Sequence, residues 1–226
     1  SGSGKSTCMN MIGCLDRPTD GIVKINGKET ALMTEKELAS LRNKTVGFVF
    51  QQFFMNPNDT VYENVLLPLK IARVGLTKRR RKVMAALKIV DLESKAKNKS
   101  TDLSGGQKQR VCIARAIVNE PKIIFADEPT GNLDSATGDK ITDLLFGLNR
   151  EKGVTLILVT HDEDLAKLCN RIVRISDGRI IDDYFVKKSE QNAAEKRHEK
   201  EAEAVRAADS TTNSSKSVKN SKKEVK

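Results

Sequence analysis

The chain has 226 residues, of which 38% are hydrophobic and 31% charged, and its formal net charge is +10. This length suits one α/β domain with an appendage. No stretch reaches the roughly 20 apolar residues that a membrane-spanning helix needs, and we expect no secretory signal at the start. Any association with a membrane is therefore expected to come through a partner protein or a surface contact.

The positive charge raises the question of nucleic-acid binding, but its distribution argues against that function. Residues 187–226 hold 11 basic and 7 acidic residues, and the remaining excess is spread over residues 1–186. The densest basic run, Lys78–Lys82, opens a helical stretch with Val83 and Leu87 on one face. We interpret this run as a solvated helix face rather than a phosphate-binding patch, and we expect no nucleic-acid partner.

Short apolar strands alternate with amphipathic helices from Ser1 to about Val186, which predicts an α/β domain with a mostly parallel sheet flanked by helices. Strands are expected at residues 22–25 before an Asn26-Gly27 turn, and at 46–50, 122–126 and 155–160, the last three covered on both faces. Helices are expected after the capping box at Thr34, at residues 62–71, 78–90 and 105–119, and around 141–148. A hairpin is expected at 171–183.

Two features of this organisation carry specific predictions. Residues 52–119 are expected to form a mostly helical subdomain, with Pro68 kinking or interrupting its first helix. Residues 187–226 contain only Val205, Val218 and Val225 as large apolar residues, so we expect a disordered tail in which 193–208 could become helical on binding. The four cysteines, which lack a metal-ligand spacing, are interpreted as buried apolar residues of a reducing cytosol.

The chain begins with Ser1–Thr7, SGSGKST, the end of the pattern G-x-x-x-x-G-K-[ST], whose first glycine would lie two residues before Ser1. The glycines let backbone N–H groups surround phosphate oxygens at the positive end of a helix. Lys5 is expected to reach the β- and γ-phosphates and Ser6 to bind Mg²⁺. A Gly/Ser cloning linker is the alternative, but the run continues directly into an apolar helix. The expected nucleotide-binding residues are Gly2, Ser3, Gly4, Lys5, Ser6 and Thr7.

A second signal is the apolar strand that ends in Asp127 and Glu128. A carboxylate at the carboxyl end of a parallel strand faces the ligand crevice of an open α/β sheet. Asp127 is therefore placed to hold Mg²⁺, and Glu128 to accept a proton from the water that attacks the γ-phosphate. The alternative is that two acids simply end a strand before a proline turn, but the preceding phosphate loop favours the catalytic interpretation.

A third signal is the sequence LSGGQ at residues 103–107, in which Ser104 is a good N-cap for the following helix. A second glycine-rich helix start offers a second anion-binding site. One nucleotide does not need two such sites in one domain. We therefore predict a head-to-tail dimer in which each site is completed by the other subunit.

These motifs together resemble those of the ABC ATPase family over residues 1–186. They occur in the family's order: SGSGKST, FVFQ ending at Gln51, LSGGQ, IIFADEPT, GNLD ending at Asp134, and LVTHD containing His161. The resemblance implies a P-loop ABC-type nucleotide-binding domain with a helical signature subdomain, ATP and Mg²⁺ as ligands, and a head-to-tail homodimer. It also implies a separate transmembrane permease that holds the chain at the cytoplasmic face of the cell membrane.

The resemblance also implies roles for individual residues. Gln51 would contact Mg²⁺ and the attacking water and relay the nucleotide state to the permease, and His161 would bind the γ-phosphate in the transition state. Asp134 would lie at the subunit interface. The signature residues, which would face the nucleotide of the opposite subunit, are Ser104, Gly105, Gly106 and Gln107. Residues 53–62 are expected to form part of the groove for a cytoplasmic helix of the permease, although Phe53 and Phe54 could each simply fill core.

Finer resemblance favours one branch of the family. The segments GCLDRPT (13–19), GFVFQQF (47–53) and ENVLLPL (63–69) are similar to those of lipoprotein-release and macrolide- or peptide-export ATPases. The family's upstream strands, first loop glycine and adenine-stacking aromatic residue are not found in this sequence. On that basis the sheet is expected to lack N-terminal strands and the chain to bind nucleotide weakly.

Other functions remain open at this point. DNA-repair and chromosome-organising ABC proteins carry long coiled-coil insertions where this sequence has only residues 52–102, and translation factors carry two ATPase domains where this one has a single LSGGQ. An ABC ATPase that regulates cell division, or an inactive fragment, is excluded less well. The sequence does not show the transported cargo.

Overall fold

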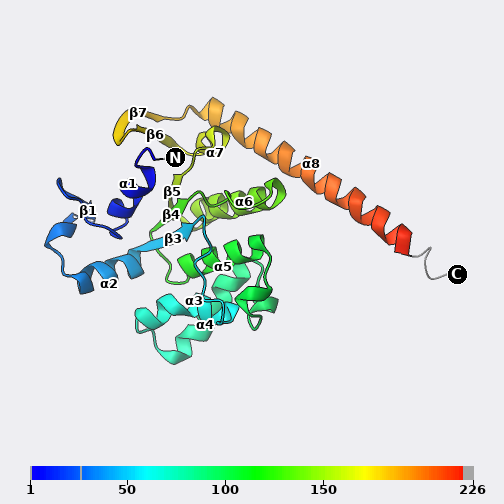
Figure 1. Cartoon of the computed structure of the whole chain (residues 1–226), viewed down its shortest axis with the longest axis horizontal. Coiled ribbons are helices and arrows are strands. Elements are labelled where there is room, and N and C mark those ends of the chain that lie inside the picture. The colour runs from blue at the N-terminus through cyan, green and yellow to red at the C-terminus, as the bar shows by residue number, and fades with distance from the viewer. Residues whose placement is uncertain (1, 26, 221–226) are drawn as a thin grey trace.

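The core of the molecule is a three-stranded parallel sheet in the order β3 (Val46–Phe50), β4 (Ile123–Asp127) and β5 (Thr155–Val159) (Figure 1). The computed structural model describes residues 2–25 and 27–220, with side chains up to residue 204. Val46 pairs with Ile123, which pairs with Thr155, so the three strands start level and end at the same edge. The predicted strands and parallel α/β sheet are confirmed. Ser1, Asn26 and residues 221–226 lie outside the described part.

Side chains alternate between the two faces of this sheet, as the period of a strand requires. Phe48 and Phe125 stack on one face and pack with Met9 of α1 (Lys5–Ile12). Val49 and Ile124 point to the other face, where α5 (Gly105–Ile117) and α6 (Ser135–Lys152) cover them. Full burial of each such side chain contributes about 1.5–3 kcal/mol. Helices therefore cover both faces of the sheet.

A helical subdomain lies beside the sheet and is built from α3 (Val61–Ile71), α4 (Leu76–Ile89) and α5 (Figure 1). Its core contains Val65, Leu69, Leu87 and Ile113, all fully buried. The helices begin within four residues of their predicted starts. Two 3₁₀ turns, Glu93–Lys95 and Ser100–Asp102, lead from α4 to α5.

We expected Pro68 to kink or interrupt its helix; an interruption is wrong, because α3 continues through this residue to Ile71, and a kink stays a prediction. Pro68 begins the last turn, and its carbonyl still accepts the N–H of Ala72 at 2.9 Å. The side-chain amide of Asn43 also donates to this carbonyl, at 3.1 Å. Buried Leu66 and Leu69 hold the helix on both sides of the proline. Packing therefore outweighs the missing N–H of one proline.

Between α1 and β3 the chain forms a small layer of local structure. Strands β1 (Lys24–Ile25) and β2 (Lys28–Glu29) pair in antiparallel fashion, and a 3₁₀ turn at Thr30–Leu32 follows. Helix α2 (Glu35–Thr45) begins with the predicted capping box, in which Thr34 and Glu37 exchange hydrogen bonds.

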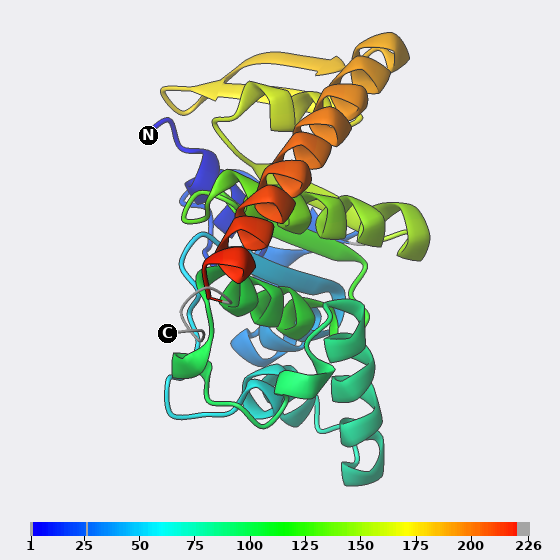
Figure 2. The same cartoon turned by 90° about the vertical axis from the view of Figure 1, so that its right-hand side faces the viewer.

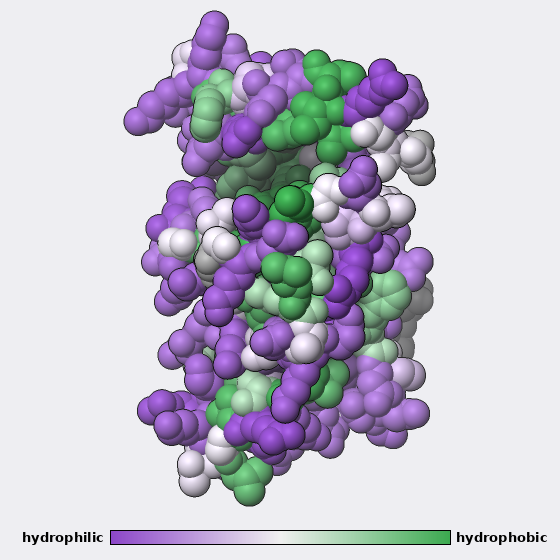
Figure 3. Space-filling model, turned by 90° about the vertical axis from the view of Figure 1, so that its left-hand side faces the viewer, coloured by the Kyte–Doolittle hydropathy of each residue, from purple (hydrophilic) through white to green (hydrophobic). Residues whose placement is uncertain are grey.

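Strands β6 (Arg171–Ser176) and β7 (Arg179–Phe185) form the predicted hairpin, which does not pair with the central sheet. A cleft of about 540 Å³ lies between this hairpin, α1 and β5, and apolar side chains such as Met9, Ile157 and Ile180 line it. Figure 3 shows this hollow with hydrophobic groups around it. The side chains of β5 are only partly covered, so the prediction that all three core strands are covered on both faces is wrong for β5.

A long helix, α8 (Lys188–Asn220), lies within the segment where we expected a disordered tail (Figures 1 and 2). Its first turns pack on α6 and on α7 (Glu163–Lys167), with Ala194 and Ala202 buried. The side-chain amide of Gln191 donates to the carbonyl of Leu168 at 3.0 Å. The expectation counted only large apolar residues, whereas alanines and polar contacts hold the part of this helix before residue 205. The division into residues 1–186 and 187–226 stays a prediction.

None of the helices between residues 2 and 220 combines the length and the apolar content needed to cross a bilayer.

Candidate functional site

The glycine loop precedes α1 and has the backbone that phosphate binding requires. Gly2 and Gly4 have φ angles of +91° and +89°, in the left-handed region that other residues avoid. Lys5 begins α1 and its Nζ donates to Ser3 Oγ at 2.6 Å. The N–H of Gly178, in the β6–β7 turn, donates to the carbonyl of Ser3 at 3.0 Å. This support by the hairpin was not foreseen, because nothing in the spacing of the sequence links the two segments.

A pocket of about 400 Å³ opens in front of this loop at the carboxyl edge of the sheet. The loop, the ends of the three parallel strands and the residues after them meet there. Its lining consists of Gly2, Ser3, Gly4, Lys5, Ser6, Thr7, Gln51, Asp127, Glu128, Val159 and His161. The structure thus brings together all the predicted phosphate-loop, Mg²⁺ and catalytic residues in one cavity.

Asp127 ends β4 next to the loop, and Ser6 Oγ donates to its Oδ1 at 3.1 Å. Partial burial raises the pKa of Asp127, and the neighbouring Glu128 adds to this rise, while Ser6 and Lys5 act against it. A half-buried carboxylate beside a hydroxyl, with the Gln51 amide lining the same pocket, offers the oxygen ligands that Mg²⁺ prefers. Among the described residues no three His, Cys, Asp or Glu side chains cluster as a metal site. Mg²⁺ usually takes one or two carboxylates and completes its shell with water and substrate phosphates.

Glu128 follows Asp127 with a φ of +44°, unusual for a residue with a side chain. Its N–H donates to the carbonyl of Val159 at 2.9 Å, which holds the strained turn against β5. Its Oε1 lies 2.8 Å from His161 Nδ1, and Thr160 Oγ1 donates to Oε2 at 3.5 Å. The side chain of Glu128 is 20% exposed and that of His161 80%. A carboxylate oriented from two sides and open to the pocket is suited to accept a proton.

Gln51 is held from the loop that follows Glu128. Asn132 Nδ2 donates to the carbonyl of Gln51 at 2.9 Å, and Gln51 Nε2 donates to Asn132 Oδ1 at 3.4 Å. A Cβ on Gly131 would lie 2.8 Å from Gln51 Nε2, so a larger residue at this position would displace the amide. We predicted Gln51 as a site residue, but the resemblance assigned no role to Asn132.

The predicted signature residues do not line this pocket. Ser104 caps α5 in a capping box with Gln107, whose N–H donates to Ser104 Oγ at 3.3 Å. Gly105 lies beside Leu133, and a Cβ on Gly106 would come within 2.2 Å of Thr137 Cγ2, so glycine allows α5 and α6 to approach closely.

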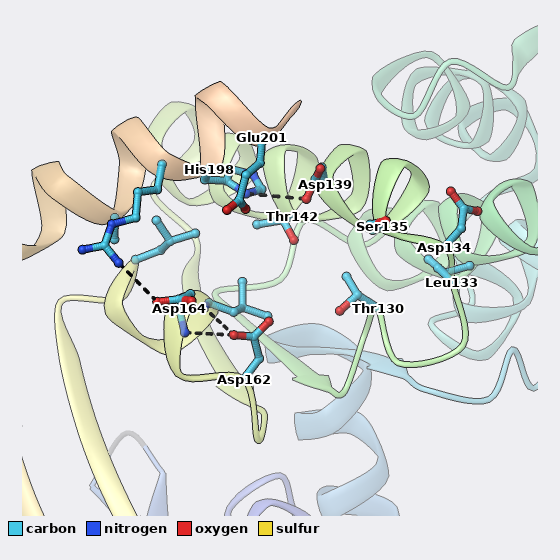
Figure 4. A pocket seen from close by; sticks show the side chains of 15 residues that line it. Thr130, Leu133, Asp134, Ser135, Asp139, Thr142, Asp162, Asp164, His198 and Glu201 are labelled. Carbon is cyan, nitrogen blue, oxygen red and sulfur yellow. Dashed lines mark hydrogen bonds and ion pairs between the residues drawn. The ribbon is translucent and has the colours of Figure 1, made fainter. Parts of the chain in front are cut away.

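Asp134 is also away from the pocket and caps α6, where it accepts the N–H of Thr137 at 3.0 Å. Hydrogen bonds from Thr137 lower the pKa of its carboxyl group. Asp134 lines a second cavity, of about 280 Å³, between α6, α7 and α8. Figure 4 shows His198 of α8 turned toward Asp139 of α6 across this cavity, with Nδ1 3.7 Å from Oδ1.

A glycine loop at a helix start, beside carboxylates at the ends of parallel strands, defines a P-loop nucleotide-binding domain. The family described as "ABC transporter" matches residues 1–131. The chain is 49% identical over 182 residues to a macrolide export ATP-binding/permease protein MacB from Syntrophobacter fumaroxidans, covering 80% of this chain and 26% of that one. It is 45% identical over 184 residues to the lipoprotein-releasing system ATP-binding protein LolD 1 of Rhodopseudomonas palustris, covering 80% of each chain.

A solved structure agrees with this relationship. The ATP-binding cassette MJ0796 of Methanocaldococcus jannaschii, described as the dimeric structure of a post-hydrolysis state bound to ADP and Pi, superposes with a TM-score of 0.75. The two chains are 46% identical, and the match covers 82% of each. This protein therefore belongs to the ABC transporter family, as an ATP-binding domain, and the predicted resemblance to the lipoprotein-release and macrolide-export branch is confirmed.

Proposed function

We propose that this chain binds and hydrolyses ATP to power a separate membrane permease. The observation that carries the proposal is the single pocket in which the glycine loop, Asp127, Glu128 and His161 converge. The family supports ATP as the ligand, and the similar cassette MJ0796 is described as bound to ADP and Pi. The reaction is ATP plus water to ADP plus phosphate.

The loop residues bind the triphosphate. Gly2 to Thr7 line the pocket, and their backbone N–H groups and the ammonium group of Lys5 would match the negative charge of phosphate oxygens. Mg²⁺ would be held by Ser6, Asp127 and Gln51. When bound, this ion would neutralise part of the negative charge of the phosphates. Most of the rate gain is expected from positioning and electrostatics, because phosphoryl transfer needs little covalent chemistry from the protein.

Glu128 accepts the proton of the attacking water in this proposal. Its carboxylate is hydrogen-bonded to His161 Nδ1, so its orientation toward the pocket is set before substrate arrives. His161 itself is largely exposed and would reach the γ-phosphate from the β5 side.

The signature residues are proposed to act on the nucleotide of a second copy. The pocket of the same chain is not lined by Ser104, Gly105 or Gly106. In a head-to-tail homodimer these residues would instead contact the nucleotide bound in the pocket of the other copy. The description of the MJ0796 cassette as dimeric supports this arrangement. Asp134, exposed at the start of α6, would lie at the subunit interface.

The permease is proposed to dock near residues 53–62 and so to hold the chain at the cytoplasmic face of the membrane. The Phe54 side chain is 62% exposed, although its ring packs edge-on against Phe50. Arg115 Nη1 donates to the Phe54 carbonyl at 2.7 Å, which keeps this apolar surface in place. The relatives named for macrolide export and lipoprotein release support export or extraction of a lipoprotein, peptide or drug.

Phosphate release from ATP with Mg²⁺ tests the proposed reaction. We expect turnover by the wild-type chain, loss of at least about 100-fold in Lys5→Ala, and no change in Lys36→Ala, an exposed lysine of α2. Equal turnover of the Lys5→Ala and wild-type chains would show that the glycine loop takes no part in the reaction.

A further inference from the structure

Gln109 is a fully buried polar residue of α5, the helix that begins at the signature residues, and its side chain reaches the carboxyl ends of β3 and β4. It lies on α5, five residues after the N-cap Ser104, and its side chain has 0% exposure. Its Nε2 donates to the carbonyl of Phe50 at 3.2 Å and to the carbonyl of Pro129 at 2.7 Å. One amide group therefore joins α5 to the ends of β3 and β4.

Both acceptors belong to residues next to the site in the chain. Phe50 precedes Gln51, and Pro129 follows Glu128. A displacement of the Phe50 carbonyl would move Gln51, because the two share one planar peptide unit, and a displacement of the Pro129 carbonyl would reach Glu128 through the planar unit that joins these two residues. Gln109 thus holds the backbone on which the water-contacting and proton-accepting side chains depend.

The other end of the same amide has no partner. Gln109 Oε1 is buried without a hydrogen bond within the described structure. A buried acceptor without a donor costs stability, and methionine would fill the same space without that cost. The residue is therefore poorly explained as core filling and better explained by the two carbonyls that it holds.

We propose that Gln109 is a positioning residue that fixes Gln51 and Glu128 relative to each other and transmits displacements of α5 to them. The proposal rests on the proposed function, in which Ser104 and Gly106 at the start of α5 contact the nucleotide of the second copy. Binding of that nucleotide would then reach the hydrolytic residues of the same chain through one side chain. The side-chain amide of Asn132, which donates to the Gln51 carbonyl at 2.9 Å, also limits the movement of this segment.

The test compares Gln109→Met with Thr142→Val, which removes a hydroxyl from another buried position, on α6. Amide hydrogen exchange of residues 50–53 and 128–132 is measured together with kcat and KM for ATP. For Gln109→Met we expect exchange in these two segments to rise about tenfold and kcat to fall about tenfold or more, with KM changed less than about threefold. Exchange in α3 and α4 should stay as in the wild type. Thr142→Val should change none of these values.

A second variant guards against failure to fold. Gln109→Glu keeps the shape of the side chain, and burial favours its protonated form, which has one O–H donor. One donor can hold only one of the two carbonyls, so amide exchange should rise more in one of the two segments than in the other. Unchanged exchange in both segments, or a rise spread evenly over the whole chain, would overturn the proposal. If the wild-type chain releases no phosphate, the proposed function fails, while the exchange measurement still decides the role of Gln109.

Discussion

His161 Nδ1 lies 2.8 Å from Glu128 Oε1, so the segment after β5 orients the carboxylate at the end of β4. The two residues are 33 positions apart in the chain and meet because their strands are parallel neighbours that end level. Glu128 reaches this position through a backbone with a φ of +44°. The site therefore depends on sheet register as much as on the residues themselves.

Removal of this imidazole is the first prediction. His161→Ala should lower kcat for ATP hydrolysis by about 100-fold or more, because the carboxylate loses its orienting partner and the pocket a hydrogen-bond donor. Nucleotide affinity, measured by calorimetry, should change little, since the loop is intact. His198→Ala, at the other histidine of the chain, is the matched control and should leave kcat unchanged. Equal losses in both variants would contradict the assigned role.

The contact between Gly106 and Thr137 gives a prediction on stability. Gly106→Ala should lower the free energy of unfolding by about 1–3 kcal/mol, because a Cβ there would overlap Thr137 Cγ2. Thr137→Ser removes that methyl group and should restore much of the loss in the double variant. Gly147→Ala, where a Cβ meets nothing within 4 Å, should stabilise α6 by about 0.5–1 kcal/mol. Chemical denaturation of the four variants measures these changes, and additive losses at positions 106 and 137 would show that the overlap is not the cause.

The packing of α8 can be tested with neighbouring alanines. Ala194 is buried against Leu165 and Leu168, whereas Ala193 is exposed. Ala194→Glu should release the helix from α6 and α7, because a buried charge without a partner is costly. Limited proteolysis and hydrogen exchange of residues 188–204 should both accelerate about tenfold or more. Ala193→Glu should behave as the wild type, and equal protection in both variants would mean that α8 is held elsewhere.

Acid should weaken the helix starts that use glutamate capping boxes. Hydrogen bonds from the Thr60 backbone and side chain lower the pKa of Glu63. Because the pKa of Glu63 is lower in the folded than in the unfolded protein, its carboxylate stabilises the folded state at pH values above the unfolded-state pKa of about 4.3. This stabilisation is lost as the pH falls through the folded-state pKa. Glu63→Gln should therefore flatten the fall of the unfolding free energy between about pH 5 and pH 3. Glu151→Gln, at an exposed position of α6, should retain the wild-type slope.

The sequence predicted the parts of this molecule that depend on local pattern. The apolar run Val46–Phe50 and the Thr34 capping box formed as expected, and the spacing of the glycine loop placed Lys5 and Ser6 in the pocket. The support of Ser3 by Gly178 could not be predicted, because it depends on where the β6–β7 turn lies in space.

Buried polar residues within helices were also missed. Gln109 lies just after the LSGGQ motif, whose glycines indicate a binding function for the helix start only. The position of Gln109 in the helix does not indicate that its amide donates to the carbonyls of Phe50 and Pro129. The helix α8 was missed because small residues such as Ala194 bury little area each and carry a weak hydrophobic signal. In both cases tertiary contacts, rather than local preference, determine the outcome.

Dimer formation by Glu128→Gln in the presence of ATP and Mg²⁺ tests the central claim most directly. Glutamine cannot accept the proton, so ATP should stay bound between the loop of one copy and Ser104 of the other, and light scattering should report a dimer. The dimer should disappear without ATP and in the double variant with Ser104→Arg, whose side chain would fill the space for the phosphate. A Glu128→Gln chain that binds ATP yet stays monomeric at every concentration would contradict the account.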